Sequence, residues 1–281
     1  MRNLFLFIIL AAATVNAIAE EPADTAFEAD PYFILMGEAD RAIADSAWTE
    51  AAARLRDALE VKPDHPSNSL LLNNLAKVYT YLGMDSLAVD AYDRGLEIAP
   101  HMTTLLNGRG RLLLAMGRDK DASKNFATII EVDSLNTDAR YYHGMLSLYS
   151  GDLAEAERDF NVLAGVIPKS TDTAIALGTL YALSGRERQA IPYLERLIKD
   201  EPSPEFFASL AGCRLALGDL TEASEAIGEG LRRYPSDPEL YYYRAWLNRD
   251  RFRLDEAHKD AEKAVRLGAN PLKVADLFNK R

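Results

Sequence analysis

Residues 70–100 read LLLNNLAKVYTYLGMDSLAVDAYDRGLEIAP, and this stretch decides the fold. Apolar residues recur at helical spacing over residues 70–82, which predicts one helix. Gly83 ends that helix because glycine adopts the left-handed cap conformation without steric cost. Asp85 or Ser86 is expected to cap the next helix, and the final proline closes it, since proline cannot continue a helix. The stretch therefore predicts a helical hairpin.

The same pattern recurs along the chain with a period close to 34 residues. The turn glycines, spaced by 34, 34, 34 and 33, are Gly83, Gly117, Gly151, Gly185 and Gly218. Five residues after each stands an alanine, at Ala88, Ala122, Ala156, Ala190 and Ala223. Four further on stands a large apolar residue, at Tyr92, Phe126, Phe160, Leu194 and Ile227. The closing position holds Pro100, Ser134, Pro168, Pro202 and Pro235. Seven before each glycine stands a small residue, at Ala76, Gly110, Gly144, Gly178 and Ala211.

Two weaker copies flank these five. The upstream copy keeps the offsets with Ala39, Ser46, Ala51, Leu55 and Pro63. The downstream copy keeps them with Ala245, Phe252, Ala257 and Ala261. Seven copies thus cover about 32–269. A single hairpin cannot bury its apolar stripe, so the copies must stack, and the small residues are expected where two helices approach closely.

A 34-residue helix–turn–helix with these residues in phase resembles the tetratricopeptide repeat (TPR) family. The resemblance implies an all-α fold, a right-handed α-solenoid of about seven hairpins with a C-terminal capping helix. Arg140 departs from the large apolar residue usual early in the first helix. The residue before the small one is polar in four copies, which are expected to be tilted or locally loose: Glu38, Arg109, His143 and Arg244.

The chain ends predict further segments. Residues 1–19 have a basic start, an apolar run over residues 4–13 and a small-residue end at Ala17-Ile18-Ala19, which indicates a secretory signal peptide cleaved after Ala19. An uncleaved membrane anchor is the alternative, although the apolar run is shorter than the roughly 20 residues that span a bilayer. An acidic leader over 20–31, a solenoid over 32–269 and an amphipathic capping helix over 270–281 follow. The expected location is exported, either periplasmic or secreted.

Composition excludes several classes of protein. The 281 residues include 43 acidic and 32 basic ones, a net charge of −11, so a nucleic acid partner is not expected. The single cysteine, Cys213, excludes an internal disulfide and a cysteine-rich metal site, and a buried inert thiol is expected there. No segment after the signal sequence is long and apolar enough to span a membrane.

We find no constellation of residues that would carry catalysis. The four histidines share no metal-ligand spacing, and His143 is expected to be a packing residue. Gly108-Arg109-Gly110 lacks the third glycine and the preceding strand of a dinucleotide-binding loop. The expectation is a protein with no enzymatic activity, no cofactor and no metal.

The resemblance also implies a concave groove lined by the first helix of each hairpin. The positions that match are Asn73, Lys77, Asn107, Arg111, Tyr141, Met145 and Tyr149. In the seventh copy they are Tyr242, Trp246 and Arg249. The asparagine-then-cation pairs look like the carboxylate clamps of some chaperone-binding members, although Asp138 would face a ligand carboxylate unfavourably. The alternative is that the polar residues are only solvated and the tyrosines only pad adjacent hairpins.

Three functions remain open. The leading hypothesis is a non-enzymatic scaffold or adaptor of the bacterial cell envelope that binds a peptide or protein in the groove. The second is a self-associating structural protein of the envelope, with the solenoid ends or the Tyr242/Trp246 patch forming a homo-oligomer. The third is a non-catalytic subunit of an envelope enzyme or assembly complex.

Overall fold

The computed structural model describes residues 30–279, and within that range it contains fifteen α-helices and no strand. The predicted signal peptide and most of the predicted acidic leader lie outside the described residues. The helices are α1 Pro31–Ala44, α2 Trp48–Val61, α3 Asn68–Tyr81, α4 Asp85–Ile98, α5 Thr103–Ala115, α6 Asp119–Val132, α7 Thr137–Ser150, α8 Leu153–Val166, α9 Thr171–Leu183, α10 Glu187–Asp200, α11 Pro204–Leu217, α12 Leu220–Arg233, α13 Pro238–Asp250, α14 Leu254–Arg266 and α15 Pro271–Asn279.

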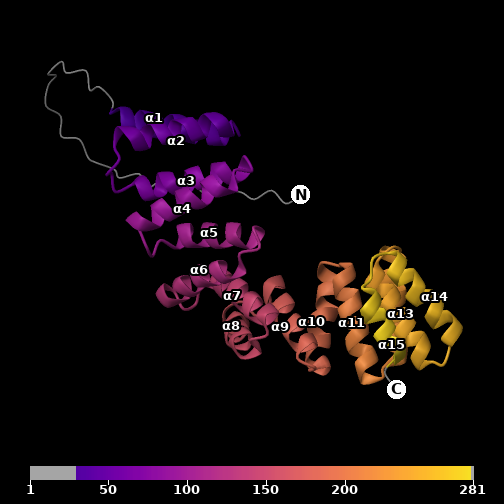
Figure 1. Ribbon diagram of the computed structural model, residues 1–281. Coiled ribbons are helices and arrows are strands. Elements are labelled where there is room, and N and C mark those ends of the chain that lie inside the picture. Colours follow the sequence, from indigo (N-terminus) through magenta and orange to yellow (C-terminus); the bar gives the residue numbers. More distant parts are fainter. Residues whose placement is uncertain (1–29, 280–281) are drawn as a thin grey trace, which may run out of the picture.

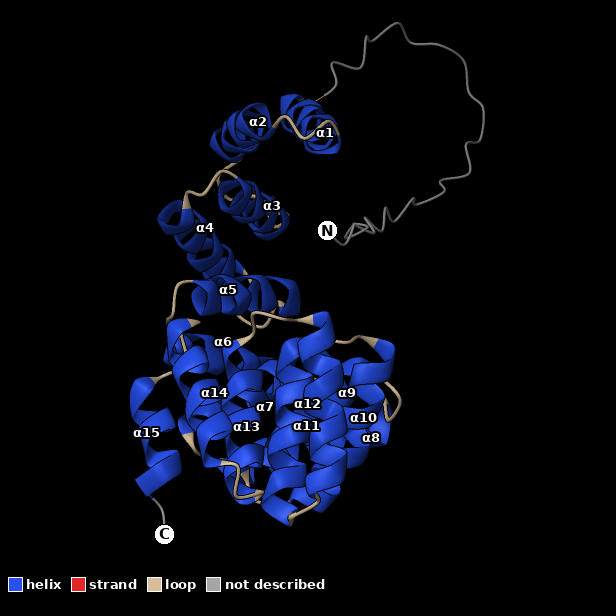
Figure 2. Cartoon of the chain, turned by 90° about the vertical axis from the view of Figure 1, so that its right-hand side faces the viewer, coloured by secondary structure: helices blue, strands red, loops and turns tan. Residues whose placement is uncertain are grey.

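These helices form seven stacked hairpins followed by α15. Each odd-numbered helix packs on the next helix of its hairpin, and each second helix packs on the first helix of the following hairpin. Helices α1 to α6 stack one below another in Figure 1, and the stack then turns near α7 and α8, so that α9 to α15 continue to the side. Figure 2 shows the same turn from a second direction. The predicted all-helical solenoid of about seven hairpins is confirmed.

The core of each hairpin is a large side chain packed against a small residue. A Cβ atom at Gly144 would lie 2.4 Å from Phe160 Cε1, and one at Gly110 would lie 2.8 Å from Phe126 Cζ. Both aromatic rings are fully buried. Any larger residue at these two positions would push the helices apart, which explains why the sequence keeps them small.

The turns inside the hairpins follow the glycine pattern, with one difference at the helix start. Gly83 has φ +70°, in the left-handed region that glycine adopts freely. The predicted capping of α4 by Asp85 or Ser86 is wrong, because the N-cap is Met84 and no side chain accepts a cap hydrogen bond. Asp85 is instead the first residue of the helix, where a carboxylate interacts favourably with the helix dipole.

The polar residues that precede the small positions have partners on the facing helix. Each pairs with a polar residue sixteen positions later, on the facing helix. The pairs are Glu38–Arg54 at 3.1 Å, Arg109–Asn125 at 3.2 Å, His143–Asp159 at 2.7 Å and Arg244–Asp260 at 2.8 Å. In the other three hairpins both positions are apolar or aromatic. These pairs account for the polar residues at these positions, since a polar group between helices is tolerated where it has a partner. That these units are tilted or locally loose stays a prediction.

The fourth hairpin carries the most buried of these pairs. The Asp159 side chain is fully buried, and both of its oxygens are occupied. Arg140 donates to Oδ1 at 2.6 Å, and His143 Nδ1 lies 2.7 Å from Oδ2. Arg140, which departs from the repeat pattern, is thus explained as a second partner for the same carboxylate. The hydrogen bond to Asp159 raises the pKa of His143 above its usual value of 6.5.

The C-terminal helix α15 covers the seventh hairpin. Val274 and Leu277 pack in one cluster with Tyr242, and Lys273 Nζ lies 4.4 Å from the centre of the Tyr242 ring. Arg249 donates to the backbone oxygen of Leu277 at 2.5 Å. The expectation that Tyr242, Trp246 and Arg249 line an open groove is therefore corrected: α15 lies over this face and caps the last apolar stripe.

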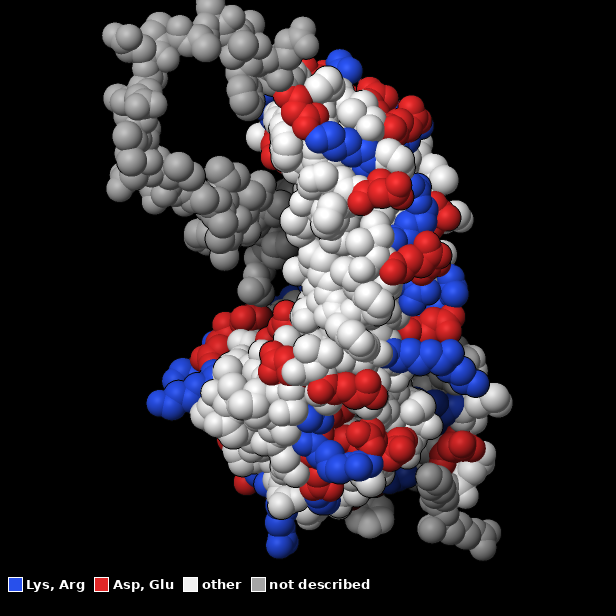
Figure 3. Space-filling view, turned by 90° about the vertical axis from the view of Figure 1, so that its left-hand side faces the viewer, with Lys and Arg blue, Asp and Glu red and all other residues white. Residues whose placement is uncertain are grey.

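Charge is distributed unevenly over the surface. Figure 3 shows an uncharged band over the N-terminal half, with basic and acidic side chains interleaved along one margin of it. Many of these charges are paired within the chain, as Arg54 is with Glu38. Among the helices of residues 30–279, none combines the length and the apolar character needed to cross a bilayer.

Substitutions at two neighbouring residues of α8 test which face of this helix packs into the core. Ala156 is fully buried, whereas Glu157 is on the surface and pairs with Arg186 at 2.7 Å. We expect Ala156→Leu to lower the free energy of unfolding by about 1–3 kcal/mol through overpacking. Glu157→Gln should lower it by less than about 1 kcal/mol, because exposed ion pairs contribute little. Equal melting temperatures of the two variants would contradict the assigned phase.

The His143 pair predicts a pH dependence of stability. Its folded-state pKa is raised, so its stabilisation is fully present below pH 6.5 and is lost as the pH rises through the folded-state pKa. The charged groups that face it are Arg140, Asp159 and Glu155. We expect His143→Gln to remove this decline in melting temperature above pH 6.5, and His101→Gln to leave it unchanged. A wild-type melting temperature that rises over this interval would refute the assignment.

Candidate functional site

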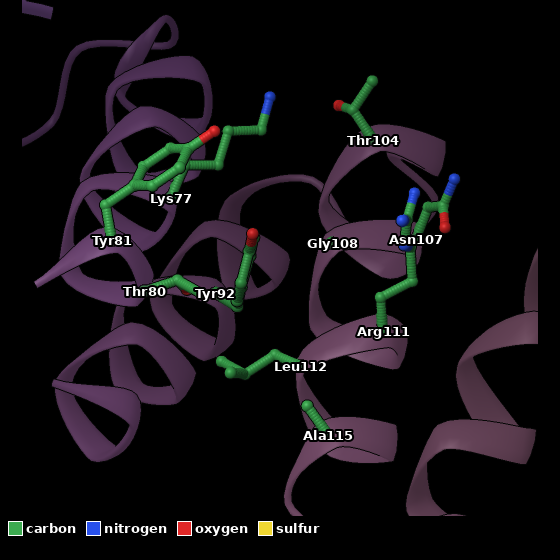
Figure 4. A pocket seen from close by; sticks show the side chains of 10 residues that line it. All are labelled: Lys77, Thr80, Tyr81, Tyr92, Thr104, Asn107, Gly108, Arg111, Leu112 and Ala115. Carbon is green, nitrogen blue, oxygen red and sulfur yellow. The ribbon is translucent and has the colours of Figure 1, made fainter. Parts of the chain in front are cut away.

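A cleft with a volume of about 520 Å³ lies between the second and third hairpins. That volume is in the range of small-ligand and peptide side-chain sites. Its walls come from α3, α4 and α5. The lining residues are Lys77, Thr80, Tyr81, Tyr92, Thr104, Asn107, Gly108, Arg111, Leu112 and Ala115. In Figure 4, Lys77 and Tyr81 stand on one wall, Asn107 and Arg111 stand on the opposite wall, and Tyr92 lies between them.

The charge in this cleft is entirely positive. Lys77 and Arg111 line it, and no carboxylate does. Within residues 30–279, neither side chain lies within 4.0 Å of a carboxylate oxygen of Asp or Glu. Burial lowers the pKa of Lys77, because the charged ammonium has lost part of its hydration. The cleft thus brings two unpaired cations together in a chain with a net charge of −11.

Arg111 is held in place by an aromatic neighbour. Its guanidinium carbon lies 5.6 Å from the centre of the Tyr142 ring, a cation–π contact with the next hairpin. Tyr142 in turn stacks on Phe126 with ring centres 5.1 Å apart. On the opposite wall, Tyr81 stacks on Trp48 at 4.4 Å. The cleft is therefore bounded by side chains whose own packing limits their motion.

The floor of the cleft depends on Tyr92 and Gly108. The Tyr92 side chain is almost fully buried, and burial raises its pKa to about 12, so its hydroxyl remains a neutral hydrogen-bonding group. A Cβ atom at Gly108 would lie 2.4 Å from the Tyr92 hydroxyl oxygen. Only glycine at position 108 leaves room for this ring. The sequence predicted Tyr92 only as a core residue and gave Gly108 no role.

Two asparagines at equivalent positions of adjacent hairpins flank the cations. Asn73 is 5% exposed and does not line the cleft, whereas Asn107 does. Their Oδ1 atoms are buried, and no donor bonds either atom among the described residues. A buried acceptor without a partner costs free energy, and of the two only Asn107 lines the cleft, where a donor from a ligand could satisfy it.

The aromatic residues predicted for the next level lie elsewhere. Tyr141 and Met145 are partly buried against a core cluster of α7 to α9 that includes Phe160 and Leu177. Burial raises the pKa of Tyr141 to about 12. Tyr149 is 71% exposed at the end of α7. None of the three lines the cleft, and Asp138 does not line it either. Whether any of these positions contacts a ligand stays a prediction.

The other reactive-type groups that stand out, a cluster at His143 and the thiol of Cys213, lie outside the cleft. His143, Glu155 and Asp159 bring ligand-type atoms within 4.8 Å of one another, but Arg140 and His143 already occupy both oxygens of Asp159. Cys213 is buried, and burial raises its pKa to about 11, which keeps it a neutral thiol. The described arrangement thus supports binding through charge, amide and aromatic groups.

The role of Gly108 is tested by adding a methyl group. We expect Gly108→Ala to displace Tyr92 and to lower the free energy of unfolding by about 1–3 kcal/mol. Gly228→Ala is the matched control, since Gly228 lies in α12 with no atom within 4 Å of an added Cβ. It should raise stability by about 0.5–1 kcal/mol. Urea unfolding measures both, and a Gly108→Ala variant as stable as wild type would show that Tyr92 is not confined as described.

Comparisons of the sequence find repeats and distant relatives. Family models described as tetratricopeptide repeat match residues 70–102, 175–227 and 214–271. Tetratricopeptide repeat protein 8 of Caenorhabditis elegans is 21% identical over 211 residues, which are 74% of this chain and 41% of that protein. DnaJ homolog subfamily C member 7 of Homo sapiens is 25% identical over 175 residues, 62% of this chain and 32% of that protein. The chain thus spans less than half the length of these curated relatives.

Comparisons of the structure find the same fold. A tetratricopeptide repeat protein from Parabacteroides merdae superposes with a TM-score of 0.66 at 21% identity, over 89% of this chain and 98% of that one. PilW, described as a type IV pilus biogenesis factor, superposes with a TM-score of 0.60 at 20% identity, over 74% of this chain and 96% of that one. YrrB, described as a TPR protein with an unusual peptide-binding site, superposes with a TM-score of 0.55 at 18% identity, over 68% of this chain and all of that one (100%). The chain thus contains tetratricopeptide repeats over residues 70–102 and 175–271, and its seven stacked hairpins have the fold of a tetratricopeptide repeat solenoid.

Proposed function

We propose that this chain is an interaction scaffold whose cleft between α3 and α5 holds an acidic protein segment or a C-terminal carboxylate. The TPR fold itself supports a role in protein–protein interaction. The observation that carries the finer proposal is the charge of the cleft: Lys77 and Arg111 line it without any carboxylate. A ligand carboxylate would replace the hydration that Lys77 has lost and would form charge-assisted hydrogen bonds with both cations.

The remaining lining residues fit an extended peptide. The free Oδ1 of Asn107 can accept a hydrogen bond from a ligand backbone N–H, and Thr104 offers a hydroxyl beside it. Tyr81, which is exposed beside the buried Tyr92 and Leu112, offers an apolar surface suited to a ligand side chain. In this proposal these residues contact the ligand in place of Tyr141 and Tyr149, which the sequence analysis placed in the groove.

The proposed location is the bacterial cell envelope. It rests on the residues of the segment 1–19 and on no structural observation. Removal of this segment would leave a scaffold held together by packing alone, with one buried thiol and no disulfide. The scaffold would then act as an adaptor, and a partner would be captured through the cleft without chemical change.

The test is a double charge reversal, Lys77→Glu with Arg111→Glu. A peptide selected from a library with free C-terminal carboxylates serves as the probe, and fluorescence anisotropy measures its affinity. We expect the double variant to weaken binding by at least about tenfold, and amidation of the peptide C-terminus to weaken binding to the wild-type chain to a similar extent. Helical content and melting temperature should stay unchanged.

A matched control separates a local from a global effect of charge. Lys120→Glu with Lys199→Glu makes the same change in net charge at exposed positions of α6 and α10, away from the cleft. It should retain the wild-type affinity. If it weakens binding as much as the cleft variant, or if the cleft variant binds normally, the ligand does not sit between Lys77 and Arg111.

A further inference from the structure

Phe252 occupies a place where the fold favours glycine. It lies in the turn between α13 and α14, at the position held by a glycine in the five strongest copies. Its φ is +60°, in the left-handed region that side chains with a Cβ adopt at a cost. The ring is also 91% exposed, so it gains nothing from burial within the described chain. An exposed aromatic residue on a strained backbone suggests a contact with another molecule.

A mostly apolar cleft lies on the same end of the solenoid. It has a volume of about 400 Å³ between α14 and α15. Its walls include Val265, Val274 and Phe278, and Phe278 stacks on His258 with ring centres 4.4 Å apart. A cavity of roughly 150 Å³ is enough to hold a benzene ring, so this cleft has room for a phenylalanine side chain. No other part of the described chain fills it.

Phe252 and the α14–α15 cleft both adjoin helix α14. Phe252 precedes its first residue, Leu254, by two positions, and the cleft begins at His258, one helical turn further on. Leu254 and Leu272 add exposed apolar surface beside them. A molecule that carries an exposed ring and a cleft at the same end offers a second copy both a side chain to insert and a place to receive one. A two-fold axis would place each ring in the other copy's cleft.

The charge of this end also favours a second copy. The chain as a whole has a net charge of −11, so two copies repel each other at a distance. Over the described residues 251–279, however, the chain has six basic and five acidic residues. Repulsion between two copies is therefore weaker at this end than the net charge of the chain would give, and the interleaved charges of α14 can pair across the axis.

We propose that the C-terminal end of the solenoid is a homodimer interface, in which Phe252 of each copy enters the α14–α15 cleft of the other. The interface lies at the far end of the solenoid from the cleft between α3 and α5, so both copies keep that cleft accessible. A dimer of this kind presents two binding clefts, and a bivalent partner would bind it more tightly than it binds a monomer.

The test compares three variants of the full chain by sedimentation velocity over a concentration series. Phe252→Ala removes the ring and keeps the strained backbone, whereas Phe252→Gly removes both. Ala275→Arg fills the cleft from an exposed lining position. We expect a concentration-dependent dimer of the wild-type chain and at least about tenfold weaker dimerisation of all three variants. Measured as monomers, only Phe252→Gly should melt at a higher temperature than Phe252→Ala and the wild type.

Leu183→Ala is the control for nonspecific association through exposed apolar side chains, since Leu183 is 61% exposed at the end of α9. It should dimerise as the wild type does. A wild-type chain that stays monomeric up to hundreds of micromolar would overturn the proposal. So would normal dimerisation of Phe252→Ala, or equal weakening by Leu183→Ala. Because the carboxylate peptide binds at the other end, its affinity tests the proposed function independently of this result.

Discussion

Contact between a large side chain of the second helix and a small residue of the first holds each hairpin together, and the rest of the molecule depends on it. Phe160 lies so close to Gly144 that a single added carbon would clash at 2.4 Å. This contact fixes the distance between the two helices and therefore the surface that each hairpin offers to the next. The constant repeat of about 34 residues then places equivalent side chains on successive levels. Lys77 and Arg111 share a cleft because their hairpins stack in this register.

Most of the fold could be predicted because the pattern reports this contact directly. The spacing of glycine, alanine and the large apolar residue follows from helix length and turn geometry, and it needs no information from distant parts of the chain. The polar pairs could not be predicted in the same way. His143 was expected only to pack, because its partner Asp159 is recognised only when the facing helix is already in place. The offset of sixteen residues, which recurs in four hairpins, is a signal that the sequence contains and that the hairpin geometry explains.

The candidate site shows more clearly that repeat position alone does not determine what a side chain contacts. Lys77, Asn107 and Arg111 were placed by repeat position alone, and the structure brings them together. Tyr141 and Met145 were placed by the same rule, yet they pack into the cluster of α7 to α9, where the stack turns. A rule based on an ideal repeat cannot describe a turn in the stack. It also cannot describe α15, which is not a repeat and covers Tyr242.

The positive cleft in a negative molecule sets two electrostatic effects against each other. The excess carboxylates repel an acidic ligand from a distance, and Lys77 and Arg111 attract it at contact. At physiological ionic strength exposed charges act over only about 8 Å, so most of the distant repulsion is screened. Lys77 is partly buried, so a contact between its ammonium and a ligand carboxylate would be screened much less. An acidic segment would therefore associate slowly at low salt, where the repulsion reaches far, and the local cations would decide whether it stays bound. This balance favours ligands that present one well-placed carboxylate over ligands that are acidic throughout, because each additional carboxylate adds repulsion and finds no further cation in the cleft.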